Sequence, residues 1–440
     1  MCGMVTTVAG FFGLIYPILS VFLILPIISL VLCTVKIFQR ANTEKVLISI
    51  LVVIWLLHAT GLFVPETGFD ALWYHLPIVQ QFVLHHRIFY IPELYQSLNP
   101  LFSDIIFLLG FQVAREFGAK IIAFLFAIGL VLTSYQLSRK VLSRKWSLVI
   151  TVLISSFQVV AWQSTSFYVD VAKAMWEVAA VWTFLFAAQK SQWKWILTSA
   201  LFLGASLATK DFSFLLIPAF VIGIFLMGKK RKLLNTLLLL FVSLTVALPF
   251  YLFSYQHTHM LTYSLAVHTD KLGEIGGEAS LPKYIWNRTV LLPSSVTQLT
   301  LFSRDYTSLI FLVFLGIFIL ELSIVWKNKT LRFLFLFSIA QWLIWWYIPP
   351  LSTRYALSGF VVLLMLYFKT IEIFLQNNPQ YKREITIAIL FAFLFTFIPR
   401  SIPITRNVKY ILGMQTKDQY LKQFYDGNID QHIKDWYRLQ

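Results

Sequence analysis

Mostly apolar runs of about 17 to 25 residues recur along the whole chain, and this is the length at which an α-helix crosses the hydrocarbon core of a bilayer. Hydrophobic residues make up 58% of the 440 residues and charged residues only 13%, which is too little polar surface to coat a water-soluble globule. Backbone groups in lipid must pair within their own segment, so each run predicts a helix. We therefore expect an all-α, polytopic transmembrane helix bundle of about twelve spans, near residues 13–37, 46–64, 119–137, 147–163, 171–189, 195–209, 212–227, 233–253, 306–326, 331–348, 354–375 and 384–399.

Lysine and arginine cluster in every second connection between these runs. Short cytoplasmic loops carry an excess of these residues, which orients the chain. The net charge of +16 is thus explained by topology and not by a nucleic-acid surface. The sequence predicts a multi-pass protein of the inner or plasma membrane, whose outer face receives residues 65–118, 164–170, 254–305, 349–353 and the tail after Pro399.

The predicted organisation is one transmembrane domain, 1–399, followed by a short external tail, 400–440. Two segments of the first large outer loop, 65–118, have the apolar spacing of helices in the plane of the membrane interface, one after Leu76 and one from Ile105 to Val113. The second large outer loop, 254–305, contains the stretch 273–278, whose glycines suit a lid.

Acidic side chains collect on the outer face, and the most informative string there is Gly68-Phe-Asp-Ala-Leu-Trp-Tyr-His-Leu-Pro77. Asp70 in this string is ionised at little cost near headgroup water, and it could take a proton from an incoming hydroxyl. An interfacial loop with an aromatic belt, in which Asp70 is a helix N-cap, explains the same residues equally well. The residues alone leave both interpretations open.

Further polar residues fall at the outer ends of predicted spans. Asp170 could cap its helix, support the surroundings of Asp70 or help to bind a cation. Lys210 and Arg354, the latter beside Tyr355, need partners at this depth, and lipid phosphate is the abundant one, although snorkelling or pairing with Asp211 is the more ordinary explanation. The histidines His257, His259 and His268 lack the partners of a metal site, so a metal stays unknown.

Four ordered stretches resemble the bacterial GT-C superfamily, the polytopic glycosyltransferases that use polyprenyl-phosphate-linked sugars and include protein O-mannosyltransferases and the aminoarabinose transferase of lipid A. The similarity spans about residues 46 to 410, and a further segment, 410–421, resembles a post-membrane segment of such proteins. The stretches are Phe69–Pro77, Tyr168–Asp170, Gly204–Lys210 and Thr353–Tyr355.

This resemblance implies an integral membrane glycosyltransferase that moves a sugar from a polyprenyl-phosphate donor to a lipid, glycan or protein acceptor on the outer face, with inversion and with Asp70 as general base. Lys210 and Arg354 would neutralise the departing phosphate, and Trp73 and Tyr74 would stack on the sugar or line the lipid entrance. The remaining expected substrate-binding residues are His75, Asp170 and Tyr355.

In one respect the chain departs from the family pattern, which more often has an acidic pair where this chain has Asp70 followed by Ala71. The departure leaves open whether His75 or Asp170 supplies the second polar function. No cofactor is certain, a divalent cation stays open, and no nucleic-acid partner is expected.

Two other functions compete. A lipid-linked saccharide flippase or transporter would bind its substrate near the bilayer midplane, where Glu177 and Glu321 are the candidate residues. An envelope polysaccharide polymerase or ligase would rely on outer arginines, which are sparse in this sequence.

Overall fold

The computed structural model describes residues 43–190, 192–228, 231–263, 281–302, 307–348, 351–424 and 428–437. Over these ranges the chain forms helices and no strand, so the predicted all-α class is confirmed. The predicted first span, 13–37, and the glycine-containing stretch 273–278 lie outside the described residues.

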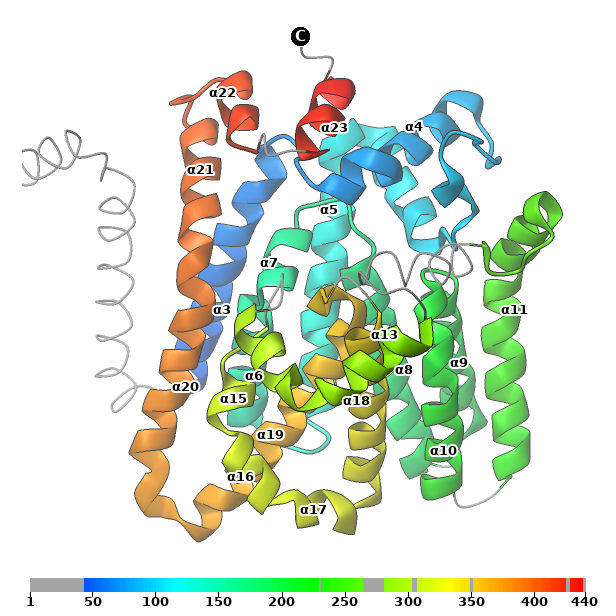
Figure 1. Cartoon of the computed structure of the whole chain (residues 1–440). Coiled ribbons are helices and arrows are strands. Elements are labelled where there is room, and N and C mark those ends of the chain that lie inside the picture. Colours follow the sequence, from blue (N-terminus) through cyan, green and yellow to red (C-terminus); the bar gives the residue numbers. More distant parts are fainter. Residues whose placement is uncertain are drawn as a thin grey trace, which may run out of the picture.

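Every predicted span within the described ranges corresponds to one helix or to consecutive shorter helices (Figure 1). The long or paired helices are α3 (Thr43–Ala59), α5 (Phe102–Ser138), α6 (Arg144–Ser156) with α7 (Gln158–Gln163), α8 (Asp170–Lys190), α9 (Trp193–Leu207), η4 (Asp211–Leu216) with α10 (Ile217–Met227), α11 (Lys232–Thr258), α18 (Lys329–Tyr347), η7 (Thr353–Ala356) with α19 (Leu357–Asn377), and α20 (Lys382–Phe397). The run at 306–326 is divided into α15 (Ile310–Val313), α16 (Leu315–Leu320) and α17 (Leu322–Lys327).

Six of the described helical stretches are long and apolar enough to cross a bilayer unaided. The count of about twelve spans is therefore not confirmed, because several apolar runs are broken into pieces shorter than a full crossing. The six stretches are Thr43–Phe63, Phe102–Ser138, Asp170–Ala188, Lys232–Thr258, Thr353–Asn377 and Pro379–Ile411.

The core of the bundle is built around α8 and α19. Helix α8 packs against α5, α9 and α19, and α19 also packs against α18 and α6. Most side chains of α19 are buried, as expected for a helix surrounded by other helices. Perimeter helices instead leave large apolar side chains exposed, for example Leu56 on α3 and Phe241 on α11, as lipid contact requires.

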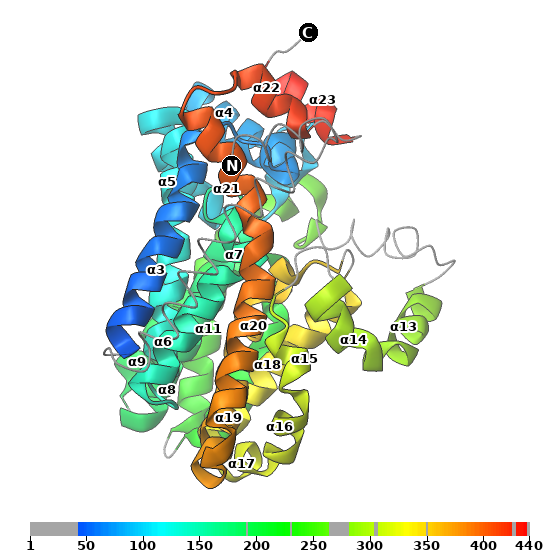
Figure 2. The ribbon, with the colours of Figure 1, turned by 90° about the vertical axis from the view of Figure 1, so that its left-hand side faces the viewer.

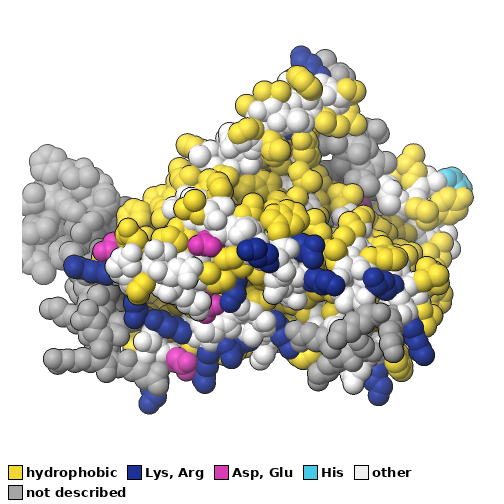
Figure 3. Space-filling view, turned by 90° about the horizontal axis from the view of Figure 1, so that it is seen from below, with side chains coloured by type: hydrophobic (Ala, Val, Ile, Leu, Met, Phe, Trp, Pro, Cys, Tyr) yellow, Lys and Arg dark blue, Asp and Glu magenta, His cyan; other side chains and the backbone are white. Residues whose placement is uncertain are grey.

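The two ends of the bundle differ in charge. The predicted basic connections lie, as far as the structure describes them, at the end drawn lowest in Figure 1, and Figure 3 shows that Lys and Arg dominate over Asp and Glu on that face. The opposite end, called the upper end below, carries the first large outer loop and the C-terminal tail. Charge at the upper end is mixed, since the tail contributes Lys409, Lys417 and Lys422.

Both predicted short helices of the first outer loop form. Helix η2 (Ala71–His75) continues into α4 (Leu76–His85), which lies across the upper end in Figure 1, and the 3-10 turn η3 (Tyr95–Leu98) follows. The second predicted helix is the first part of α5, which ends where Ala114 and Arg115 leave helical geometry. At this break the backbones of Gly110 and Gly118 come into direct contact.

The C-terminal tail packs back onto the first outer loop. Helix α21 (Ser401–Ile411) prolongs α20 through η9 (Ile398–Arg400), and α22 (Lys417–Leu421), η10 (Lys422–Phe424) and α23 (Asn428–Tyr437) follow at the upper end. The Ile433 side chain is fully buried in the apolar cluster of that loop. The Tyr437 hydroxyl donates to the Glu116 carboxylate at 2.8 Å and to the Glu66 carbonyl at 3.1 Å.

The described part of the second outer loop is helical as well. It contains α13 (Leu281–Val290), η5 (Leu292–Ser294), α14 (Ser295–Thr297) and η6 (Gln298–Phe302), and Figure 2 shows α13 and α14 projecting to one side of the bundle.

Candidate functional site

Four charged side chains from four different elements meet at the upper end of the bundle. Asp70 precedes η2, Asp170 begins α8, Lys210 precedes η4, and Arg354 lies in η7. Arg354 Nη1 lies 2.8 Å from Asp70 Oδ2, and Lys210 Nζ lies 2.8 Å from Asp170 Oδ1. Arg354 Nε lies 3.8 Å from Asp170 Oδ2 and so links the two pairs. The sequence therefore identified residues that converge in space.

Asp170 is held rigidly at the start of α8. Its side chain is 1% exposed, and Gln163 Nε2 donates to its Oδ2 at 2.9 Å. The amide oxygen of Gln163 in turn accepts from the Val171 N–H at 3.1 Å. A carboxylate at a helix N-terminus is favoured by the helix dipole. Asp170 is thus a buried anchor for both cations.

Asp70 is positioned by its backbone. Its N–H donates to the Tyr168 hydroxyl at 2.9 Å, and a Cβ at Gly68 would lie 2.6 Å from the Tyr168 ring, so glycine allows this approach. Asp70 makes no side-chain capping bond to η2. The interpretation of Asp70 as a helix N-cap is therefore wrong, because its carboxylate pairs with Arg354 instead.

Lys210 remains a cation in this environment. Burial is the largest influence on the pKa of its ammonium group and lowers it, but the attraction of Asp170 and Tyr355 and the hydrogen bond to Asp170 together raise that pKa above its usual value. The ammonium nitrogen also lies 5.1 Å from the centre of the Tyr355 ring. Around Asp70 the pKa of Tyr168 is raised, chiefly by burial and then by the nearby carboxylate, so this phenol stays neutral.

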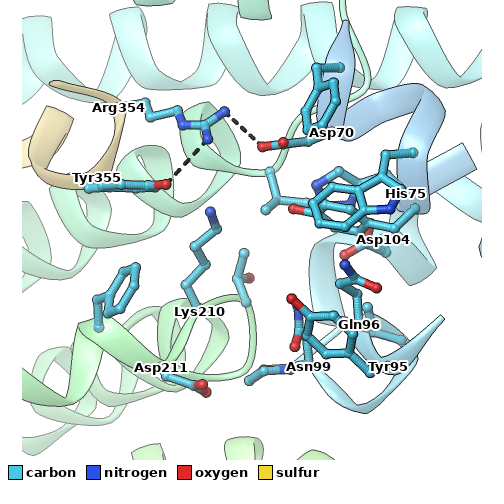
Figure 4. Close-up of a pocket in the computed structure, with 18 residues that line it drawn as sticks. Asp70, His75, Tyr95, Gln96, Asn99, Asp104, Lys210, Asp211, Arg354 and Tyr355 are labelled. Carbon is cyan, nitrogen blue, oxygen red and sulfur yellow. Dashed lines mark hydrogen bonds and ion pairs between the residues drawn. The ribbon is translucent and has the colours of Figure 1, made fainter. Parts of the chain in front are cut away.

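These side chains border a cavity of about 270 Å³ (Figure 4). Arg354, Tyr355 and Lys210 lie on one side of it, and His75 lies across from them. Asp170 does not line the cavity and acts on it only through its two cations. The predicted residues that line it are Asp70, Trp73, Tyr74, His75, Lys210, Arg354 and Tyr355.

The sequence interpretation missed part of the wall that faces the cations. Asp104, from the first turn of α5, lies 2.6 Å from His75 Nδ1, and both side chains are buried. Gln96 and Asn99, within and just after η3, line the same wall. The sequence does place polar residues just before Pro100 in an otherwise apolar loop, which could have indicated a polar site. No spacing rule, however, connects these residues with His75.

A second buried ion pair supports the loop that carries Arg354. Lys173 Nζ lies 2.9 Å from Glu177 Oε1 and donates to the Tyr355 carbonyl at 3.0 Å. The Glu177 carboxylate also accepts from Gln341 at 2.8 Å, and further from Ser206, Ser213 and Ser358. It is fully buried and does not line the cavity. Glu177 is therefore bound within the bundle and serves to position η7.

Metal ligands do not cluster in the described part of the chain, where no group of three or more His, Cys, Asp or Glu side chains could hold an ion. His257 Nδ1 bonds to the Phe253 carbonyl of its own helix at 2.9 Å, and His268 lies outside the described residues.

Comparison with known proteins supports the resemblance. Residues 99–254 match the family model of dolichyl-phosphate-mannose-protein mannosyltransferases. The fold is similar to ArnT from Cupriavidus metallidurans bound to undecaprenyl phosphate, with a TM-score of 0.57 and 13% identity over 90% of this chain and 78% of that one. The predicted resemblance to GT-C membrane glycosyltransferases is thus confirmed in the fold and in the matched residues, which include two of the four motif stretches, Tyr168–Asp170 and Gly204–Lys210.

Other GT-C structures share the fold over a smaller part of their length. The oligosaccharyltransferase of Archaeoglobus fulgidus, in complex with Zn and sulfate, matches with a TM-score of 0.55 and 16% identity over 86% of this chain and 57% of that one. The same organism's AglB, in complex with an inhibitory peptide and a dolichol-phosphate, matches with a TM-score of 0.52 and 15% identity over 89% and 61%. This chain thus spans less than two thirds of those chains. No curated protein sequence matches it.

Proposed function

We propose that this protein transfers a sugar from a polyprenyl-phosphate donor to a hydroxyl or amine acceptor at the upper end of the bundle, with inversion at the anomeric carbon. The observation that carries the proposal is the convergence of Asp70, Lys210 and Arg354 on one cavity, with Asp170 directly behind the two cations. Similar folds that hold undecaprenyl phosphate and a dolichol-phosphate support a carrier lipid of this class.

Asp70 is the general base in this reaction. Its Oδ2 is engaged by Arg354, so we assign Oδ1 to accept the proton of the acceptor. The deprotonated acceptor attacks the anomeric carbon from the side opposite the phosphate, which breaks the carbon–oxygen bond to phosphate and inverts the configuration. A phosphate leaves without protonation, so no second carboxyl acid is required.

The two cations stabilise the charge that develops on the leaving phosphate. Arg354 has five N–H donors. Nη1 contacts Asp70, Nη2 donates to the Tyr355 hydroxyl at 3.3 Å, and each of these two nitrogens carries a second N–H. Donor capacity for an incoming phosphate oxygen therefore remains, and preorganised charge of this kind is a large source of rate enhancement.

The upper end of the bundle corresponds to the outer face of an inner or plasma membrane in this proposal. The basic connections at the lower end support that orientation. Residues 1–399 then form the catalytic membrane domain, and the tail 400–440 is an external segment that packs over the first outer loop.

Transport is less well supported than transfer. The carboxylate of the midplane candidate Glu177 already pairs with Lys173 and accepts hydrogen bonds from Gln341 and three serines. Glu321 lies in the turn between α16 and α17. Neither residue lines the cavity. A polymerase that relies on outer arginines is not favoured either, because Arg354 is the single arginine among the described residues that line the cavity.

Replacing Asp70 tests the proposal. We expect Asp70→Asn to reduce transfer by roughly 10²- to 10⁴-fold, since it removes the base but keeps the shape of the side chain. The measurement is release of undecaprenyl phosphate from labelled undecaprenyl-phosphate sugars by the purified chain in proteoliposomes that contain lipids of the source organism. The exposed Glu93→Gln is the matched control, because Glu93 lies in the same loop but away from the cavity.

Transfer by Asp70→Asn at the rate of the Glu93→Gln variant would remove Asp70 as the base. Retained anomeric configuration in the product, determined by NMR, would exclude the single displacement.

A further inference from the structure

We propose that His75, Gln96, Asn99 and Asp104 form the sugar-recognition wall of the cavity, and that they select a donor carrying a single monosaccharide without a negative charge. This inference rests on the proposed transferase function and specifies its substrate class.

The wall presents polar atoms that lack partners in the described part of the chain. His75 Nε2, Gln96 Nε2 and Asn99 Oδ1 are buried and have no hydrogen-bond partner. The His75 and Gln96 side chains are almost fully buried, at 3% and 4% exposure. A buried polar group without a hydrogen-bond partner lowers the stability of the fold. Several such groups on one wall therefore indicate a ligand that supplies their partners.

The polarity of these atoms matches sugar hydroxyls. With Nδ1–H of His75 donating to Asp104, the Nε2 atom of a neutral imidazole is an acceptor. Gln96 Nε2 is a donor and Asn99 Oδ1 is an acceptor. A hydroxyl both donates and accepts, so neighbouring hydroxyls on one ring can satisfy all three atoms.

The position of the wall assigns it to the sugar of the donor. Figure 4 shows His75, Gln96 and Asn99 across the cavity from Lys210 and Arg354. A phosphate held by the two cations places its attached sugar against this opposite wall, with the anomeric carbon within reach of Asp70. The volume of about 270 Å³ is at the lower end for ligand pockets, which suits one sugar rather than an oligosaccharide.

The charges around the cavity disfavour an anionic sugar. Three carboxylates, those of Asp70, Asp104 and Asp211, line the cavity. The lining cations Lys210 and Arg354 already pair with Asp170 and Asp70 and bind the phosphate in the proposed reaction. A sugar carboxylate on the opposite wall would therefore lie beside other carboxylates and away from the two cations, and burying it unpaired is unfavourable.

Binding of defined donors to the full chain in nanodiscs tests the wall. The probes are undecaprenyl phosphate alone and the same carrier bearing glucose or mannose, which are uncharged, or glucuronic acid, which is anionic. We expect at least one uncharged sugar to tighten binding about tenfold relative to the bare carrier, or about 1.4 kcal/mol, and glucuronic acid to give no such gain.

Variants of the wall locate the effect. Gln96→Met and Asn99→Leu keep the side-chain size but remove the polar atoms, and each should abolish the tenfold gain without weakening the binding of undecaprenyl phosphate. Gln112→Met, at an exposed position of α5 away from the cavity, is the matched control and should keep the gain. Unchanged affinity for the bare carrier also shows that each variant is folded.

The outcomes separate the two proposals. Equal affinity of the wild type for the anionic and the uncharged donors, or an undiminished gain in both wall variants, would overturn the sugar-recognition wall and leave the carrier site intact. Failure of the wild type to bind undecaprenyl phosphate would overturn the proposed function itself, and this inference with it.

Discussion

Lys210 and Asp170 form an ion pair that is almost completely shielded from solvent, with side-chain exposures of 18% and 1%. Removing one partner of a buried pair is far more costly than removing both, because a single change leaves an uncompensated charge. The pair therefore offers a way to separate the structural role of Lys210 from its proposed role toward phosphate.

Lys210→Met should lower the free energy of unfolding by up to about 3–5 kcal/mol, since Asp170 then keeps only the more distant Arg354 as a counter-charge. The double variant Lys210→Met/Asp170→Leu should recover most of that stability but not the binding of undecaprenyl phosphate. Denaturant unfolding in detergent and carrier-lipid binding measure the two effects. Lys369→Met, which breaks a more exposed pair with Glu372, is the control and should cost no more than about 1 kcal/mol.

A double variant that binds undecaprenyl phosphate as tightly as the wild type would show that Lys210 serves the fold alone. Stability of the single variant equal to that of the control would instead show that the pair contributes little to folding.

Individual residues were predictable only where an ordered motif marked them. Asp70, Lys210 and Arg354 were found because each belongs to a stretch that resembles the GT-C superfamily, and the structure brings them together. Gln96 and Asn99 belong to no such stretch. Their burial depends on how η3 packs under the neighbouring helices, and hydropathy along the sequence carries no information on that packing.

At the scale of elements, the break in α5 determines where Asp104 lies. Non-helical geometry at Ala114 and Arg115 turns the chain, and Gly110 and Gly118 contact each other through their backbones. Arg115 has a φ of 50°, a region that non-glycine residues adopt at some cost. The close glycine contact therefore stabilises a turn that is locally unfavourable.

Gly118→Ala should displace the first part of α5, because the new methyl group would meet the Gly110 carbonyl. We expect a loss of about 1–3 kcal/mol in unfolding free energy. Transfer activity should also fall, since Asp104 and its contact with His75 would shift. Gly316→Ala is the control, because nothing lies within 4 Å of a Cβ at that helical position.

Stability and activity of both glycine variants are compared in the same detergent. Equal behaviour of Gly118→Ala and Gly316→Ala would show that the contact between the two backbones is not needed.

The number of spans was less predictable than their positions. The run 306–326 is mostly apolar, yet its described part forms three short helices with turns at Phe314 and Glu321. Apolar composition indicates which segments are buried away from water, but the continuity of a helix depends on local packing. Hydropathy therefore predicts one span where the structure has three short helices.

At the scale of the whole molecule, the C-terminal tail completes the upper end. Ile433 is buried among side chains of the first outer loop, and the His432 ring lies 5.0 Å from that of Phe69. Phe69 lines the cavity, and so does Trp73, whose ring lies 6.2 Å from that of His432, so the tail contacts two residues of the site. The sequence predicted a short external tail, but no apolar run there indicated where it would dock.

Ile433→Glu should release α23 from the first outer loop, because a charge cannot be buried unpaired at this position. We expect faster tryptic cleavage after Lys434 and reduced transfer, with the helical content of the bundle unchanged. Gln431→Glu introduces the same charge at an exposed position of α23 and is the matched control. Normal activity together with a released α23 would show that the tail is dispensable for the site.

The helical stretch Pro379–Ile411 has 33 residues, and the views in Figures 1 and 2 show it running along the height of the bundle. A helix of that length measures roughly 50 Å, whereas the hydrocarbon core is about 30 Å thick. Lys382 and Arg383 mark the lower boundary of the hydrocarbon core. Most of the helix length that exceeds the core thickness therefore extends beyond the upper leaflet. In the proposed reaction the carrier diffuses laterally within the bilayer, and an acceptor that arrives from water encounters α22 and α23 before it reaches Asp70.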